Sequence, residues 1–178
     1  MLCYRNGDAG AFDTLYVRHK GGVYRYLLRQ CRDAAVAEEL FQDVWSNLIR
    51  ARAGYAVQAK FTTYLYRLAH NRLIDHYRKH NLAAVTSFDA EDGPALDDLM
   101  DDHERPPDAA YDMKRLAADL LRLVAELPTP QREAFLMQQE GGMSVEEIAA
   151  ATGVSRETAK SRLRYALGKL RHGMSKWQ

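Results

Sequence analysis

Seven cations crowd the C-terminal end of this chain, in a pattern that suits a helix that binds DNA. Between Arg156 and Lys176 the sequence has seven Lys or Arg residues and one acid, Glu157. A helix fits the DNA major groove, where its first residues reach base edges and later cations hold phosphates. The polar faces of the expected helix carry Arg156, Lys160, Ser161, Arg162, Arg164, Lys169 and Arg171. The alternative is a solvated basic helix in an ordinary bundle, but the charge bias coincides with suitable turn chemistry.

The residues around the start of this segment predict a helix-turn-helix. Ser144 is the expected N-cap of a first helix, and Glu147 completes a capping box three residues later. Gly153 is free to take a positive φ and should end that helix, after which Ser155 caps the next one. The second helix has an apolar repeat that is expected to face inward, namely Ala159, Leu163, Ala166, Leu167 and Leu170.

A second candidate site for nucleic acid lies on an expected helix over residues 61–80. One stripe of this helix carries a ring, cations and an amide, at Tyr64, Arg67, Asn71, Asp75 and Arg78. Rings stack on unpaired bases and cations hold phosphates, so the stripe suits single-stranded nucleic acid. Further rings stand nearby at Tyr55, Tyr66 and Tyr77. The alternative is an amphipathic helix with ordinary surface charge, in which Asp75 pairs with Lys79 four residues on.

A third surface is expected on a helix over residues 34–52, capped by Asp33. Its acidic and amide residues lie off the apolar stripe, at Glu38, Glu39, Gln42 and Asp43. A solvated acidic face is the simplest interpretation. The sharper interpretation is a protein-docking face, because Trp45 and Ile49, expected to be exposed beside these acids, suit a basic partner helix.

Charge divides the chain into three segments. The 178 residues together carry a net charge of +1, which would not by itself suggest nucleic acid. Residues 1–81 carry +6, residues 82–112 carry −9, and residues 113–178 carry +4. The acidic segment has three prolines and little hydrophobic periodicity, as in a linker. We therefore predict an all-α protein with two small helical domains, 1–81 and 111–178, joined by an acidic flexible linker over 82–110.

The remaining elements are also predicted to be helices. A first helical segment should start at Gly7-Asp8 and have a weak point at Gly21-Gly22. Helices should resume over residues 111–127 and 131–140, with a turn marked by Pro128 and Pro130 between them. No convincing strand, internal repeat or glycine-rich phosphate loop is found in the sequence.

The sequence does not fit several classes of protein. Cys3 and Cys31 are the only cysteines, so neither a disulfide framework nor a zinc knuckle is indicated, and a reducing cytoplasm fits. The sequence has neither a signal peptide nor an apolar run long enough to span a membrane. His76 and His80 stand four residues apart next to Asp75, but the pattern is not that of a zinc protease. We expect no metal, no cofactor and no enzymatic activity.

Three segments in this order resemble one family. AEELFQDVW, FTTYLYRLAHNRLIDHYR and LPTPQREAFLMQQEGGMSVEEIAAATGVSRETAKSRLRYALGKLR are each similar to segments of bacterial extracytoplasmic-function (ECF) sigma factors. The resemblance covers residues 7–81 and 111–172, and the joint occurrence of the three segments is specific. It implies that residues 1–81 form sigma region 2 and residues 111–178 form sigma region 4. It also implies core RNA polymerase and promoter DNA as partners, and an anti-sigma factor as a further partner.

The resemblance also assigns roles to residues. The polymerase-docking motif matches Glu39, Leu40, Gln42 and Asp43. The surface that melts the promoter −10 element and binds its single strand matches Tyr55, Phe61, Tyr64, Arg67, Asn71 and Arg78. The helix that reads the −35 duplex matches Arg156, Thr158, Lys160, Ser161, Arg162, Arg164 and Tyr165. The acidic linker would occupy the RNA exit path of the polymerase.

An autonomous helix-turn-helix regulator is the alternative function. Such regulators usually dimerise to read paired half-sites, and this chain has no obvious dimerisation coiled coil. A regulator of that kind would also bind its operator without polymerase.

Overall fold

A computed structural model describes residues 1–80 and 109–175, and in these residues the chain is helical with no strand. The first half consists of α1 (Leu2–Arg5), α2 (Ala9–Cys31), α3 (Ala34–Arg50) and α4 (Phe61–Lys79). The second half consists of α6 (Ala109–Glu126), α7 (Thr129–Gly141), α8 (Val145–Thr152) and α9 (Arg156–Gly173). The predicted all-α class is confirmed. The predicted linker lies outside the described residues, except for its last two, which already belong to α6.

Side-chain caps set the starts of α2 and α3. The Asp8 side chain accepts a hydrogen bond from the backbone of Ala11 at 3.2 Å and starts α2. Asp33 caps α3 as predicted, accepting from the backbone N–H groups of Ala35 at 2.8 Å and Val36 at 3.1 Å. These side chains satisfy amides that a helix start leaves without partners.

Two predictions about the first half are wrong. The Gly21-Gly22 pair does not interrupt α2, which is continuous because its buried face packs on α3 and α7. Trp45 is only 4% exposed, so it cannot contribute to a docking surface. It lies in an aromatic cluster with Phe12, Tyr16 and Phe41, at ring-centroid distances between 4.9 and 6.2 Å. Burial of such rings stabilises this end of the bundle.

The predicted helix-turn-helix is present in α8 and α9. Ser144 and Glu147 form a reciprocal capping box, with bonds of 2.8 and 3.3 Å. Gly153 adopts φ +73° and ends α8, and the Ser155 side chain caps α9. The inward positions of α9 are buried except Leu167, which is 37% exposed, so the prediction for that residue is wrong.

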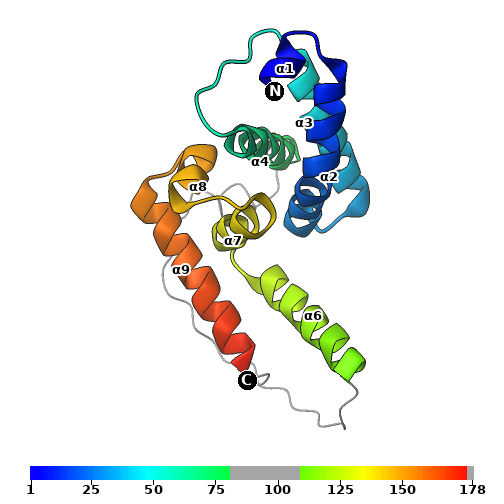
Figure 1. The fold of residues 1–178 in the computed structure, drawn as a ribbon. Coiled ribbons are helices and arrows are strands. Elements are labelled where there is room, and N and C mark those ends of the chain that lie inside the picture. The colour runs from blue at the N-terminus through cyan, green and yellow to red at the C-terminus, as the bar shows by residue number, and fades with distance from the viewer. Residues whose placement is uncertain (81–108, 176–178) are drawn as a thin grey trace.

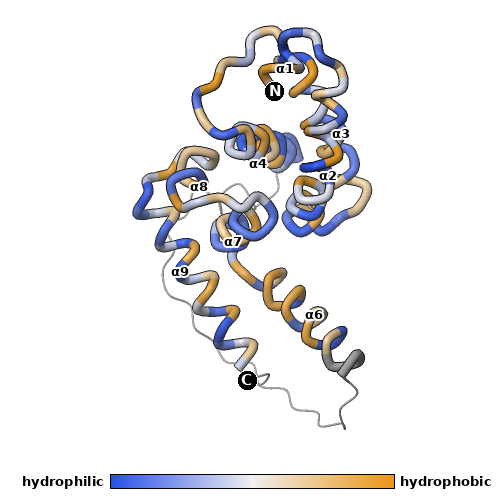
Figure 2. The backbone as a smooth tube through the Cα atoms, in the orientation of Figure 1, coloured by the Kyte–Doolittle hydropathy of each residue, from blue (hydrophilic) through white to orange (hydrophobic). Residues whose placement is uncertain are grey.

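The two halves pack on each other in the described residues. Helix α7 lies on α2, and α8 lies on α4, which brings the second half of the chain against the first (Figure 1). One hydrophobic cluster runs through both halves, from Val23 and Leu73 to Ile148 and Leu170. Helices α6 and α9 extend away from this centre, and the colouring of Figure 2 shows how apolar α6 is. None of the described helices is both long and apolar enough to cross a bilayer.

Candidate nucleic-acid interface

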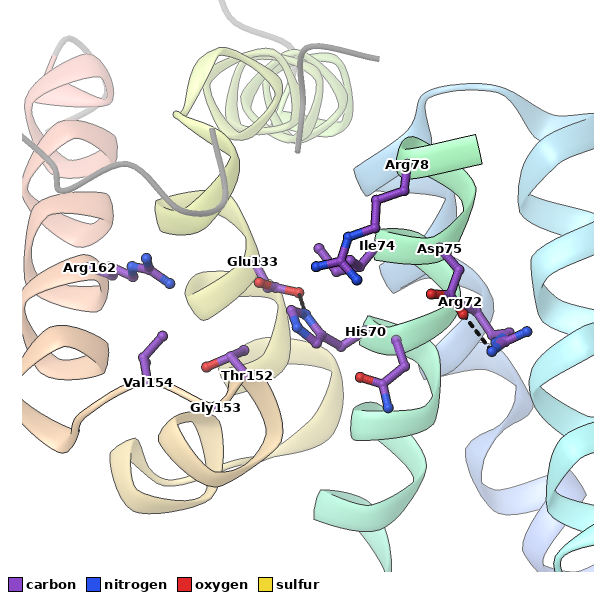
Figure 3. A pocket seen from close by; sticks show the side chains of 11 residues that line it. His70, Arg72, Ile74, Asp75, Arg78, Glu133, Thr152, Gly153, Val154 and Arg162 are labelled. Atoms are coloured by element: carbon purple, nitrogen blue, oxygen red, sulfur yellow. Dashed lines mark hydrogen bonds and ion pairs between the residues drawn. The ribbon is translucent and has the colours of Figure 1, made fainter. Parts of the chain in front are cut away.

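A pocket of about 440 Å³ lies where α4 meets the helix-turn-helix (Figure 3). The α4 side contributes His70, Asn71, Arg72, Ile74, Asp75 and Arg78. The opposite side contributes Glu133 of α7, the turn residues Thr152, Gly153 and Val154, and Arg162 of α9. Residues predicted for two different DNA elements, Asn71 and Arg78 on one side and Arg162 on the other, therefore line the same pocket.

The predicted single-strand site on α4 is only partly exposed. The side chains of Arg67, Asn71 and Arg78 are exposed to solvent. Phe61 and Tyr64 are half-buried. Their rings contact neighbouring rings. Phe61 packs on His19 with centroids 5.3 Å apart, and Tyr64 packs edge-on against Tyr55 at 5.2 Å.

Tyr55 itself is only 8% exposed, and its carbonyl accepts a hydrogen bond from Arg5 at 3.0 Å. In this arrangement Tyr55 supports Tyr64 and offers little ring surface to a base. Asp75 pairs with Arg72 at 2.6 Å, so the i,i+4 pair with Lys79 that the alternative interpretation offered is not the one formed. The exposed cations of α4 are thus Arg67, Arg78 and Lys79, with the exposed amide of Asn71 between them and Arg72 half-buried.

The predicted duplex site on α9 is mostly exposed. Arg156, Lys160, Arg164 and Tyr165 are exposed, whereas Thr158, Ser161 and Arg162 are half-buried. The guanidinium of Arg164 lies over the ring of Tyr165, 5.0 Å from its centroid. Such a contact holds the cation at a defined place on the helix surface.

Arg156 is paired within the chain. It contacts Glu146 at 2.6 Å and Glu157 at 3.2 Å. The hydrogen bond from Arg156 lowers the pKa of the exposed Glu146 carboxyl to about 2. Exposed ion pairs of this kind contribute little stability, so Arg156 can exchange its acids for DNA phosphates at low cost.

The predicted docking residues on α3 divide into an exposed and a buried group. Glu39 and Gln42 are exposed, and Asp43 is half-buried. Gln42 donates a hydrogen bond to Glu38 at 3.2 Å, one helical turn back. Leu40 is 4% exposed and belongs to the core, so it can support this face but not touch a partner.

Sequence reasoning missed a polar network between the two halves. Glu133 of α7 is only 1% exposed. Its Oε1 accepts a hydrogen bond from the Tyr26 hydroxyl at 2.6 Å and lies 2.7 Å from Nδ1 of His70. Burial, with a smaller contribution from Glu133, raises the pKa of Tyr26 well above its ordinary value, so that hydroxyl stays a donor. No local pattern marks Glu133, because its partners are more than 60 residues away in the sequence.

Among residues 1–80 and 109–175 no group of His, Cys, Asp and Glu has the arrangement to hold a metal ion. The rings of His76 and His80 instead pack against each other with centroids 4.4 Å apart.

Comparison with known protein families matches both halves of the chain to regions of sigma factors. A family profile described as sigma-70 region 2 matches residues 15–83, and one described as sigma-70, region 4 matches residues 117–170. The RNA polymerase sigma factor CarQ of Myxococcus xanthus is 31% identical over 172 residues, or 96% of this chain and 93% of that protein. The ECF RNA polymerase sigma factor RpoE of Cereibacter sphaeroides is 33% identical over 171 residues, with coverages of 94% and 88%.

Solved structures share the fold. CnrH in complex with the cytosolic domain of CnrY aligns with a TM-score of 0.65 at 20% identity, covering 97% of this chain and 92% of that one. The sigma factor RpoE of Bartonella quintana, in complex with the anti-sigma factor NepR, aligns with a TM-score of 0.67 at 18% identity, covering 93% and 97%.

The fold, the helix-turn-helix and the family matches define a transcription initiation factor with two DNA-binding regions. The chain belongs to the ECF family of RNA polymerase sigma factors. It directs promoter recognition and transcription initiation, and the autonomous regulator is not favoured. Sigma factors are in general regulators of transcription without catalytic activity.

Proposed function

We propose that this sigma factor docks on core polymerase through α3, opens the −10 element with α4 and reads the −35 duplex with α9. The observation that carries the proposal is the pairing of two exposed cationic surfaces in one chain. Arg67, Asn71 and Arg78 project from α4, and Arg164 with its neighbours projects from a fully capped helix-turn-helix. The protein acts in the cytoplasm and catalyses no reaction itself.

Docking on a polymerase would solve an energetic problem. Opening a duplex costs a few kcal/mol for each unstacked base step. Region 2 is a bundle of a few helices and cannot supply that free energy alone. Polymerase adds contacts and positions both regions, while the connection between the regions keeps the effective concentration of the second one high.

The first test concerns dependence on polymerase. We expect the free protein to bind DNA weakly, with an affinity that falls steeply as salt rises, because phosphate contacts release counterions. Thymines near the start site should become reactive to potassium permanganate only when core polymerase is added. Specific operator binding of equal strength without polymerase would instead support an autonomous regulator.

The second test concerns the docking face. Asp43→Arg should weaken holoenzyme formation, because it reverses a charge presented to a basic partner helix. Asp13→Arg is the matched control, since Asp13 is an exposed acid on α2. Both variants should retain the helical circular dichroism of the wild type. Undiminished core binding by a folded Asp43→Arg variant in a pull-down assay would refute the assignment of α3.

We also propose that an anti-sigma factor binds this chain. The support is the fold shared with CnrH, solved in complex with the cytosolic domain of CnrY, and with the sigma factor RpoE, solved in complex with the anti-sigma factor NepR. A genuine anti-sigma factor should co-purify with the chain and, once isolated, abolish run-off transcription in proportion to its concentration.

A further inference from the structure

The pocket between α4, α7 and the helix-turn-helix has the size of a small-molecule site. Its volume of about 440 Å³ falls in the range of roughly 300–1,000 Å³ that is usual for ligand pockets. Three separate stretches of the chain enclose it, namely residues 70–78 on α4, Glu133 on α7, and residues 152–162 from the end of α8 into α9. A ligand bound here would therefore be contacted from several sides.

The lining of the pocket carries more guanidinium groups than carboxylates. Its arginines are Arg72, Arg78 and Arg162, and its acids are Asp75 and Glu133. Arg72 pairs with Asp75 at 2.6 Å, so these two residues add no net charge. The guanidinium groups of Arg78 and Arg162 point into the pocket from opposite walls (Figure 3).

The remaining acid does not balance these two arginines. Oε1 of Glu133 accepts a hydrogen bond from the Tyr26 hydroxyl at 2.6 Å and lies 2.7 Å from Nδ1 of His70. The protonated form of His70 is in turn repelled by Arg162 and Arg78, which places the three cationic groups within electrostatic reach of one another. Like charges gathered in a half-enclosed site are unfavourable unless an anion joins them. The pocket therefore suits an anionic ligand.

The arginines favour phosphate among the common anions. A guanidinium group presents its N–H donors in a fork that matches two phosphate oxygens. Two such groups on opposite walls suit a terminal phosphate, which carries close to two negative charges near neutral pH. A phosphate within a DNA strand carries one charge and is joined to the chain at both ends, so it fits a half-enclosed pocket less well.

The rest of the pocket suits a small polar organic group. A free phosphate ion would fill only a fraction of the volume of about 440 Å³. Beside the arginines, the lining offers the exposed amide of Asn71 and the half-buried apolar side chains of Ile74 and Val154. The Thr152 hydroxyl donates to the carbonyl of Ile148 at 2.8 Å, so its oxygen can still accept a hydrogen bond. Hydroxyl groups of a sugar match these polar groups.

We propose that this pocket binds a small sugar phosphate ester, either a sugar phosphate or a nucleotide, whose phosphate is held between Arg78 and Arg162. Asn71, Arg78 and Arg162 are also residues that we assign to promoter DNA. A bound ester would therefore compete with DNA for the same side chains, and this consequence rests on the proposed function. The concentration of a phosphorylated metabolite would then set how much of the protein can bind a promoter.

Isothermal titration calorimetry on the full chain tests the site, with ribose 5-phosphate and adenosine 5′-monophosphate as the two ester probes. Ribose and adenosine lack the phosphate, and inorganic phosphate lacks the sugar, so these three are the matched ligands at equal ionic strength. We expect saturable binding of at least one ester, weaker binding of inorganic phosphate, and no binding of ribose or adenosine. The ester that binds more tightly shows whether the site takes a sugar phosphate or a nucleotide.

Two pairs of variants locate the bound ester. Arg78→Ala and Arg162→Ala each remove a guanidinium group from one wall and should weaken ester binding by roughly ten- to a hundredfold, as expected for hydrogen bonds to a charged group. Arg67→Ala on α4 and Arg164→Ala on α9 are the matched controls and should bind the ester like the wild type, because both arginines are exposed and do not line the pocket. If Arg162→Ala loses helical circular dichroism, Arg162→Lys replaces it, since lysine keeps the charge without the fork.

Equal losses of affinity in all four variants, or no saturable binding of either ester at millimolar concentrations, would overturn the site. Equal affinities for inorganic phosphate and for both esters would overturn its assignment to an ester. Competition is measured separately, as the effect of the ester on binding of a single-stranded −10 oligonucleotide. Ester binding that depends on Arg78 and Arg162 but leaves oligonucleotide binding unchanged would support the site and contradict the proposed role of Arg78 in DNA contact.

Discussion

Asn71→Ala should impair promoter opening, whereas Arg162→Ala and Arg164→Ala should weaken association of the holoenzyme with the −35 duplex. Each arginine that contacts a base should contribute roughly 1–3 kcal/mol, and less if it contacts only phosphate. Loss of Asn71 removes a partner for an extruded base and so raises the free energy of the open complex. Arg122→Ala is the control, because Arg122 is an exposed cation on α6, outside both predicted DNA-binding surfaces.

Promoter DNA with a mismatched bubble separates the two effects. The bubble removes the cost of melting, so part of the Asn71→Ala defect should disappear and the part due to lost base contact should remain. Short bubble DNA without the −35 element should bind the wild type and both arginine variants alike. Fluorescence anisotropy on duplex and bubble probes measures both effects. If Asn71→Ala altered only the −35 duplex affinity, or the arginine variants acted only on the bubble, the assignment of α4 and α9 would be reversed.

The features predicted from sequence were those that short-range chemistry determines. Ser144 with Glu147, Gly153 and Ser155 set the helix-turn-helix through bonds between residues a few positions apart. Asp33 did the same for α3. The resulting helix boundaries agree with the structure to within one to two residues, since caps leave little freedom at a helix start.

The predictions that were wrong concern long-range packing. Trp45 was placed outside because it stands beside acids, but α2 supplies Phe12 and Tyr16 to cover it. A weak point at Gly21-Gly22 was expected from propensity, yet α2 is continuous there and the approach of α7 requires glycine at position 22. Glycine in a helix interior is less favourable than alanine by only about 1 kcal/mol, and tertiary contacts override that cost.

Glu133 illustrates why the contact between the two halves could not be predicted from the sequence. In the segment LPTPQREAFLMQQE it looks like an ordinary surface acid on an amphipathic helix. It is buried because α2 and α4 cover α7, and the sequence pattern of one helix does not indicate which other helix covers it. The expected architecture of two domains joined by a linker therefore did not include this contact.

The pair of His70 and Glu133 should make the stability of the folded protein depend on pH. Burial lowers the pKa of His70, but the attraction and hydrogen bond of Glu133 outweigh burial and raise the pKa above the ordinary 6.5. Arg162 and Arg78 face the same ring and oppose part of that rise. Because the folded pKa exceeds the unfolded pKa, the stabilisation is fully present below about pH 6.5 and is lost as the pH rises through the folded value.

His70→Gln isolates this contribution, because glutamine keeps an N–H donor for Glu133 but cannot gain a proton. Urea unfolding from about pH 5.5 to about pH 8.5 should show wild type more stable than His70→Gln at low pH, with a difference that shrinks as the pH rises. Glu133→Ala should cost about 3–5 kcal/mol at the acidic end, because it leaves His70 charged and the Tyr26 hydroxyl buried without an acceptor. A difference between wild type and His70→Gln that stayed constant or grew with pH would show that Glu133 does not hold the histidine in its charged form.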